Sequence, residues 1–223
     1  MLSTAIPQEH VEAALATRAL ACPTCSGPLS PWGFARSREV RTRDGTRRVT
    51  PRRARCGWGE ATHVLAPSWL VPRRRDDAEV IGEALRLAAG GHGHRVIARQ
   101  FGRPDGTVRG WLRTARRRAG SLRACATRHL VSLDLELGAV VPAGSDLGDA
   151  VEAIMLAVRA WALRFGRNTL SPWERAVWLT GGLTRTSTAP TVARLAVVPS
   201  PLDARPFERQ LPLLLDAKRG PRR

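Results

Sequence analysis

Residues 94–118 read HRVIARQFGRPDGTVRGWLRTARRR and predict two short helices around a glycine turn, with arginines on the outer face of the second. Ile97 and Phe101 are four residues apart, so they lie on one apolar face of the first helix. Gly102 follows where the chain must turn, since glycine adopts positive φ angles without side-chain strain. Pro104 suits a helix start because its missing NH would have no intrahelical partner there. The pattern is typical of a helix-turn-helix.

A third helix precedes this pair, and the three make a unit over residues 77–118. Val108 and Leu112 give the last helix an apolar seam, with Trp111 beside them. The upstream apolar stripe consists of Ile81, Ala84, Leu85 and Ala88 and ends at Gly90 and Gly91. Outside the seam, the last helix carries small residues and arginines, which suit a helix that reads a DNA major groove. The predicted DNA contacts are Arg103, Thr107, Arg109, Arg113, Arg116 and Arg117. The alternative is a solvated basic helix in an ordinary bundle.

The charge of the chain is strongly positive and unevenly placed. The formal net charge is +17, with 24 basic and 10 acidic side chains in residues 1–128 against 12 and 9 in residues 129–223. Such a surplus concentrates phosphate-bearing partners and makes their binding steeply dependent on salt. RNA or an anionic membrane would also attract it. Lys218 is the only lysine, a bias that a GC-rich genome also produces, so net charge carries more weight than arginine identity.

Length and composition limit the remaining classes. With 223 residues, 43% of them hydrophobic, the chain can form two or three small domains. No apolar run approaches the roughly 20 residues of a membrane span. The first residues lack the layout of a secretory signal, so we expect a cytoplasmic protein that does not bind membranes. Four cysteines in a reducing compartment indicate thiols or metal ligands rather than disulfides.

Three of the cysteines have the spacing of a zinc ribbon. Cys22 and Cys25 form a Cys-Pro-Thr-Cys knuckle, and Cys56 follows an arginine-rich segment. A complete ribbon would have a fourth cysteine two residues after Cys56, but the residue at that place is Gly59. Tetrahedral structural zinc takes four donors, so another residue must complete the site or the site has decayed.

The candidates for the fourth ligand are His63 and Glu60, and His63 is the better zinc ligand. A closed site of this kind has no open position for a substrate, so a bound zinc ion would be structural. Cys125 lies in a separate segment and is most simply an ordinary thiol.

The segment between the knuckles predicts a basic β-hairpin. Asp44-Gly45 is a strong two-residue turn signal between strand-like residues 34–43 and 46–55. A basic ribbon of this kind can lie along a nucleic-acid backbone, and a short arginine linker follows it. The predicted backbone contacts are Arg47, Arg48, Arg73, Arg74 and Arg75. The alternative is a solvated, partly disordered hairpin whose charges only aid solubility.

These motifs together resemble a known arrangement. The CPTC knuckle, the arginine-rich hairpin, Thr62-His63, PRRRDDAEVIGEAL at 72–85 and IARQFGRPDGTVRGWLR at 97–113 are similar to zinc-ribbon plus homeodomain-like helix-turn-helix modules. Such modules occur in insertion-sequence and transposase-associated proteins of GC-rich bacteria, including an uncharacterised family. The resemblance covers residues 20–120 and implies DNA binding, with zinc held by the three cysteines. Gly59 departs from the pattern, which puts zinc in doubt.

The remainder of the chain predicts helices and a tail. Residues 145–165 have an amphipathic pattern, and a second helix starts at the Ser171-Pro172 capping signal and ends at Gly181. Their apolar stripes form either core or a homodimer face. The predicted division is an N-terminal helix at 1–20, a zinc-ribbon-like hairpin at 21–70, a helix-turn-helix domain at 71–120, a helical region at 121–183 and a proline-rich flexible tail at 184–223.

The expected fold class is mainly α with a small β-hairpin, and the expected function is sequence-specific binding of double-stranded DNA. The chain carries no Ser-His-Asp pattern, phosphate-binding glycine loop or His-x3-His site, and about 100 residues are too few for a metal-dependent nuclease domain. We therefore expect neither catalysis nor a small-molecule substrate. A regulator and a mobile-element recognition protein are both compatible. The alternative is a structural or RNA-associated basic protein, or a transposase remnant.

Overall fold

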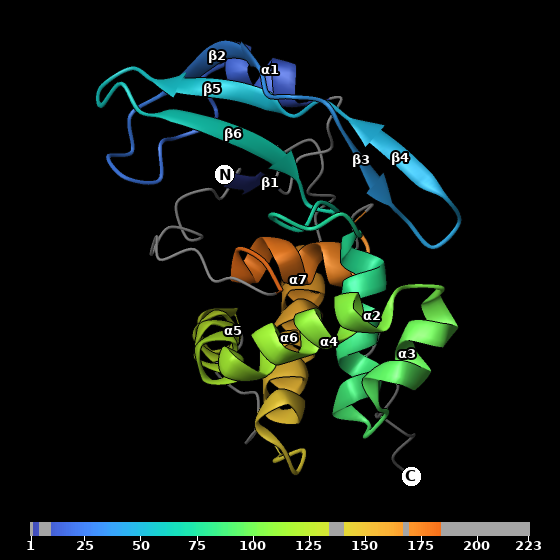
Figure 1. The fold of residues 1–223 in the computed structure, drawn as a ribbon. Helices are drawn as coiled ribbons and strands as arrows, with labels where there is room; N and C mark the ends of the chain where they lie inside the picture. The colour runs from blue at the N-terminus through green and yellow to red at the C-terminus, as the bar shows by residue number, and fades with distance from the viewer. Residues whose placement is uncertain (1, 5–9, 134–140, 167–169, 184–223) are drawn as a thin grey trace, which may run out of the picture.

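The computed structural model describes residues 2–4, 10–133, 141–166 and 170–183. A sheet lies over a group of helices, and a long hairpin extends from the sheet to one side (Figure 1). The described residues are about 51% helix and 18% strand. The predicted fold class, mainly α with strands confined to a small hairpin, is therefore wrong, and the protein is mixed α and β. The predicted tail at 184–223 lies outside the described residues.

The four-stranded sheet has the order β1-β6-β5-β2. Strands β2 (Leu29–Phe34), β5 (Arg52–Cys56) and β6 (Thr62–Pro67) are antiparallel, whereas β1 (Leu2–Thr4) pairs parallel with β6. The short helix α1 (Val11–Ala16) buries its apolar face against this sheet. Their shared core contains Val11, Leu15, Leu20, Leu29, Ala54 and Leu65. The four-stranded sheet and α1 therefore share a hydrophobic core that is separate from the core of the helices.

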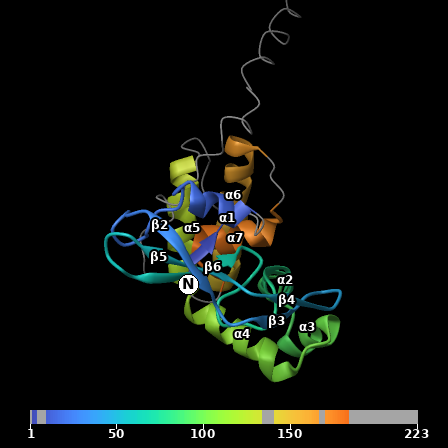
Figure 2. The same ribbon diagram turned by 90° about the horizontal axis from the view of Figure 1, so that it is seen from above.

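A separate hairpin is formed by β3 (Arg38–Arg41) and β4 (Thr46–Val49). The predicted turn at Asp44-Gly45 is confirmed, because the NH of Thr42 donates to the carbonyl of Gly45 at 2.8 Å. The prediction of two continuous strands is wrong. Pro51 has no NH to continue the ladder, and the register between β2 and β5 shifts between Pro31 and Phe34. The hairpin therefore leaves the sheet and lies over α2 and α3 (Figures 1 and 2).

Six helices share one hydrophobic core: α2 (Ala78–Ala89), α3 (His94–Phe101), α4 (Asp105–Arg117), α5 (Ala119–Leu133), α6 (Asp146–Phe165) and α7 (Pro172–Thr180). The predicted helices on either side of Gly102 are present, and Gly102 adopts φ 60° and ψ 40°. The predicted capping box at Ser171 is also confirmed.

The three predicted helices at 77–118 do not close a core by themselves. Trp173 of α7 packs directly on Gly82 of α2, where even a Cβ atom would overlap the indole ring. Helix α5 packs along α6, and α6 also contacts α2 and α4. The apolar seam of α4 therefore packs in a core that also includes α5, α6 and α7. None of the described helices combines the length and apolar character needed to cross a lipid bilayer.

One buried carboxylate joins the hairpin to the helices. Asp76 is 1% exposed and pairs with two arginines, Arg41 of β3 and Arg103 of the turn before α4, each at 2.6 Å. The same two arginines also hydrogen-bond to nearby backbone carbonyls. The backbone NH of Arg41 donates to the carbonyl of Arg75, and Nη2 of Arg103 donates to the carbonyl of Thr42 at 2.8 Å. We call this arrangement the Asp76 clasp. It fixes the hairpin against the first turn of α4.

We expect Asp76→Ala to lower the free energy of unfolding by about 3 kcal/mol, because it removes one partner of a buried pair and leaves Arg103 with an uncompensated charge. Urea denaturation measures this change. The matched control is Glu39→Gln, which breaks an exposed pair with Arg48 and should cost about 0.5 kcal/mol or less. Equal losses in the two variants would show that the clasp does not hold the hairpin.

Candidate metal centre and nucleic-acid interface

The three predicted cysteine ligands come together in the structure. The Sγ atoms of Cys22, Cys25 and Cys56 all lie within 4.8 Å of one another. Cys22 and Cys25 belong to a tight turn in which the NH of Ser26 donates to the carbonyl of Cys22, and Cys56 ends β5. Tetrahedral zinc with Zn–S bonds of ~2.3 Å holds its sulfurs ~3.8 Å apart. Three thiols at this separation could hold a metal ion.

One further donor lies beside one of the three thiols. Nε2 of His63 lies 3.4 Å from Sγ of Cys22, although His63 is not within the three-sulfur group. Glu60, the other predicted candidate, pairs with Arg55 at 2.8 Å. His63 is thus the better placed of the two. A Cβ atom at Gly59 would lie 3.7 Å from Sγ of Cys25, in ordinary van der Waals contact.

Backbone NH groups stabilise a thiolate in this cluster. The NH of Gly59 donates to Sγ of Cys56 at 3.3 Å, and this hydrogen bond is the main reason that the pKa of Cys56 is lowered to about 7. Burial lowers the pKa of His63, which keeps its imidazole neutral at physiological pH. A thiolate and a neutral imidazole are the protonation states that bind metal.

A fourth thiol should strengthen metal binding at this site. Gly59→Cys places it beside Cys25 and Cys56 without a backbone clash, so we expect the variant to bind Zn²⁺ at least tenfold more tightly than the natural chain. Competition with a chromophoric chelator measures this affinity, and Co²⁺ absorption reports tetrahedral thiolate coordination.

Gly59→Ser is the matched control, since it fills the same space without a thiol and should leave Zn²⁺ affinity near that of the natural chain. Cys56→Ser should abolish binding. If Gly59→Cys and Gly59→Ser bound Zn²⁺ equally well, position 59 would not face the metal.

The predicted contact helix presents arginines outward. Arg109, Arg113, Arg116 and Arg117 are exposed, and none of them is ion-paired within the part of the chain that the structure describes. The opposite face of α4 is buried through Val108, Trp111, Leu112 and Ala115. Figure 2 places α3 and α4 along the outer edge of the molecule.

The start of α4 is unobstructed. Side chains at Gly106 and Gly110 would meet nothing within 4 Å, and Thr107 between them is half-buried. The first turns of α4 are therefore narrow, and its later turns carry the exposed arginines. This is the distribution of size and charge that a helix needs to approach base edges closely.

Arg103, a predicted DNA contact, lies elsewhere. Its side chain is only 13% exposed, and its nitrogens donate to Asp76, to the carbonyl of Phe101 and to the carbonyl of Thr42. The structure thus gives Arg103 a positioning role in the Asp76 clasp. Sequence reasoning missed this role because the clasp joins residues up to 61 positions apart.

The two predicted hairpin contacts face opposite sides. The guanidinium of Arg47 stacks on Trp69 at 4.5 Å from the ring centre, on the side that covers Val40 and Val49. Arg48 lies on the other side, where it is 75% exposed and pairs with Glu39. Both positions leave a positive charge at the surface of the hairpin.

The predicted linker contacts Arg73, Arg74 and Arg75 line one wall of a groove of about 940 Å³. The hairpin forms the other wall. Seven arginines line this cavity, which we call the arginine groove: Arg36, Arg38, Arg41, Arg48, Arg73, Arg74 and Arg75. Glu39 is the one acid among its lining residues. The sequence showed these arginines but gave no sign that the chain gathers them around one space.

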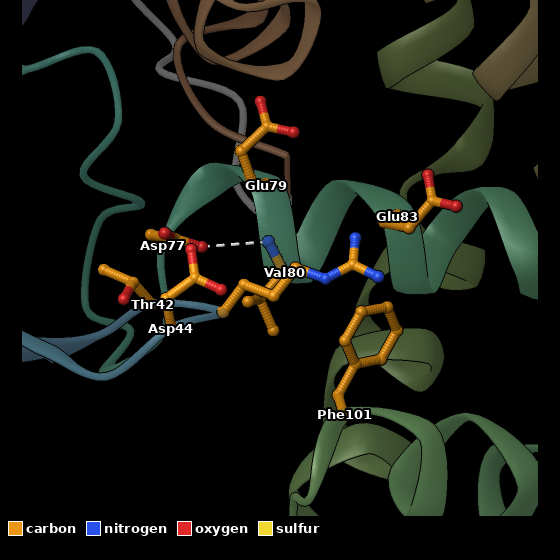
Figure 3. Close-up of a pocket in the computed structure, with 8 residues that line it drawn as sticks. Thr42, Asp44, Asp77, Glu79, Val80, Glu83 and Phe101 are labelled. Atoms are coloured by element: carbon orange, nitrogen blue, oxygen red, sulfur yellow. Dashed lines mark hydrogen bonds between the residues drawn. The ribbon is translucent and has the colours of Figure 1, made fainter.

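A second cavity, of about 260 Å³, has the opposite charge. It lies between the hairpin turn and α2, where Asp44, Asp77, Glu79 and Glu83 line it together with Phe101 (Figure 3). Burial raises the pKa of the Asp77 carboxyl, which caps α2 by accepting from the NH of Val80 at 2.9 Å. Three more acids than bases line this cavity, since Arg43 is the one basic residue among them, and such a wall disfavours phosphate.

Exposed aromatic rings form a further feature that the sequence analysis did not single out. Trp32 and Phe34 of β2 are 50% and 59% exposed. Arg55 stacks on Trp32 at 4.7 Å, and Arg52 stacks on Phe34 at 4.4 Å. The alternating Trp-Gly-Phe of β2 was the available signal.

Comparison with known proteins gives one match. Residues 22–111 are similar to a family described as a domain of unknown function (DUF6431). This span begins at the first cysteine of the thiol cluster and ends within α4, so it includes the hairpin and the Asp76 clasp. No curated protein and no solved structure matches the chain.

Proposed function

We propose that this chain is a sequence-specific double-stranded DNA-binding protein in which α3 and α4 act as a helix-turn-helix. The observation that carries the proposal is the outward face of α4, where Arg109, Arg113, Arg116 and Arg117 are exposed without an acidic partner among the described residues. Arginine forks onto guanine edges, and further arginines on the same helix bind phosphates. A transcriptional regulator and a mobile-element recognition protein both use such a helix.

We further propose that the cluster of Cys22, Cys25 and Cys56 holds a structural zinc ion, with His63 as the fourth ligand. In this role the metal organises the loop that precedes β2 and the end of β5. The protein acts by binding rather than by catalysis, in the cytoplasm. We expect a homodimer on DNA, since paired half-sites are the usual route to high specificity for single helix-turn-helix modules.

The direct test changes the two arginines nearest the start of α4. We expect Arg109→Ala with Arg113→Ala to cost about 2–4 kcal/mol of binding free energy on a duplex selected from random sequences, because each residue supplies a base contact. Fluorescence anisotropy at fixed physiological salt measures the loss. Arg47→Ala should act weakly and equally on all duplexes, and the remote exposed Arg159→Ala is the control.

A double variant that keeps both affinity and sequence preference would refute the assignment of α4 as the reading helix. The second candidate is an RNA-associated protein, which the exposed Trp32 and Phe34 favour because single-stranded bases stack on such rings. Salt titrations with duplex DNA and with single-stranded RNA separate the two. Tighter binding to RNA, lost in Trp32→Ala, would favour the RNA reading.

A further inference from the structure

The arginine groove contains cationic nitrogens that the described protein leaves without acceptors. Nε and Nη2 of Arg38 and Nε of Arg41 are buried, and none of the three has a hydrogen-bond partner among the described residues. Buried donors are rarely left in this state, because desolvation costs free energy that a hydrogen bond normally returns. The side chains of Arg38 and Arg41 both line the groove, so an anion bound there would lie beside them.

The charge of the groove identifies the kind of acceptor. Seven arginines and one glutamate line it, a surplus of six positive charges among the lining residues, although Glu39 is paired with Arg48 and Arg41 is paired with the buried Asp76 behind the groove. Guanidinium groups bind phosphate through two parallel hydrogen bonds, and several of them around one space favour an anion that carries more than one charge. A neutral or singly charged small molecule would leave most of this charge uncompensated.

The groove is also held in place by the backbone. The NH of Arg41 donates to the carbonyl of Arg75, and the NH of Asp77 donates to the carbonyl of Arg41 at 3.1 Å. The linker wall is therefore paired with the edge of β3, while the Asp76 clasp fixes both to the helices. A site that is formed before binding loses little entropy when a ligand enters.

We propose that the arginine groove is a phosphate-binding site in which Arg38 is the central ligand. The phosphate groups belong either to a DNA backbone or to a free phosphate-bearing molecule. Only the first source rests on the proposed function, since the groove and its unsatisfied nitrogens do not depend on α4. The site is separate from α4, and it recognises phosphate groups without regard to base sequence.

The test is calorimetry of inorganic pyrophosphate with the full chain at low ionic strength. We expect saturable binding that Arg38→Gln weakens at least tenfold and Arg75→Gln weakens severalfold. Arg159→Gln, on the exposed face of α6, removes the same charge away from the groove and should change the affinity less than twofold. Equal affinities in Arg38→Gln and Arg159→Gln would overturn the proposal, as would the absence of saturable binding.

Unchanged thermal unfolding midpoints establish that the variants fold. If Arg38→Gln does not fold, the affinity of Arg75→Gln for pyrophosphate decides the test. A second arm adds duplex DNA. If pyrophosphate displaces duplex of any sequence and Arg38→Gln weakens that binding, the groove holds the DNA backbone. If neither pyrophosphate nor Arg38→Gln changes the affinity for duplex DNA, the ligand of the groove is a free phosphate-bearing molecule. A chain that binds pyrophosphate in the groove but binds no duplex supports this site and refutes the proposed function.

Discussion

The arrangement of this protein depends on one buried carboxylate shared between two arginines. Asp76 must be paired because an isolated charge at 1% exposure is unstable, and its two partners belong to different parts of the fold. Arg41 belongs to β3, and Arg103 belongs to the turn before α4, so the ion pairs join these two segments at Asp76. The hairpin is thereby fixed against the start of the helix whose arginines face outward. Without this ion pair, the hairpin would be joined to the helices through loops, a small apolar contact and the backbone hydrogen bonds that Arg41 makes with Arg75 and Asp77.

The thiol cluster and the Asp76 clasp lie in different parts of the fold. Strand β5 begins near Pro51, where the chain returns from the hairpin, and ends at Cys56 in the thiol cluster, whereas Arg41 of the clasp lies at the turn end of the hairpin, opposite Thr46. The four-stranded sheet and α1 share a hydrophobic core, so a metal ion would stabilise a part of the fold that already buries apolar side chains. The position of the hairpin is set by Asp76 rather than by the thiols. The proposed metal binding and the proposed DNA contact through α4 therefore rest on separate parts of the structure.

The sequence predicted those elements whose signals are local. Gly102 marks its turn because the backbone there needs a positive φ, and Ser171 marks a helix start through a hydrogen bond to its own first turn. The three thiols were likewise predicted from their spacing, and the structure brings them together. Strand β1 was missed because its parallel pairing with β6 joins segments about 60 residues apart. The role of Arg103 was missed for the same reason: its acceptor is 27 positions away.

The number of arginines is a weak guide to function, and their acceptors are a stronger one. A biased composition produces arginines everywhere, but folding assigns each guanidinium an environment. Arg103 and Arg41 each form an ion pair with Asp76, and Arg52 forms an ion pair with Glu12. On α4 the seam residues face inward, so the arginines between them point to solvent, whereas the half-buried Arg38 has two buried nitrogens without a partner among the described residues. Exposed arginines without acidic partners among the described residues, like those of α4, suit the proposed contact with a polyanion through many weak interactions. The arginines gathered around one groove suit the proposed phosphate site instead, because an anion held there can accept from several guanidinium groups at once.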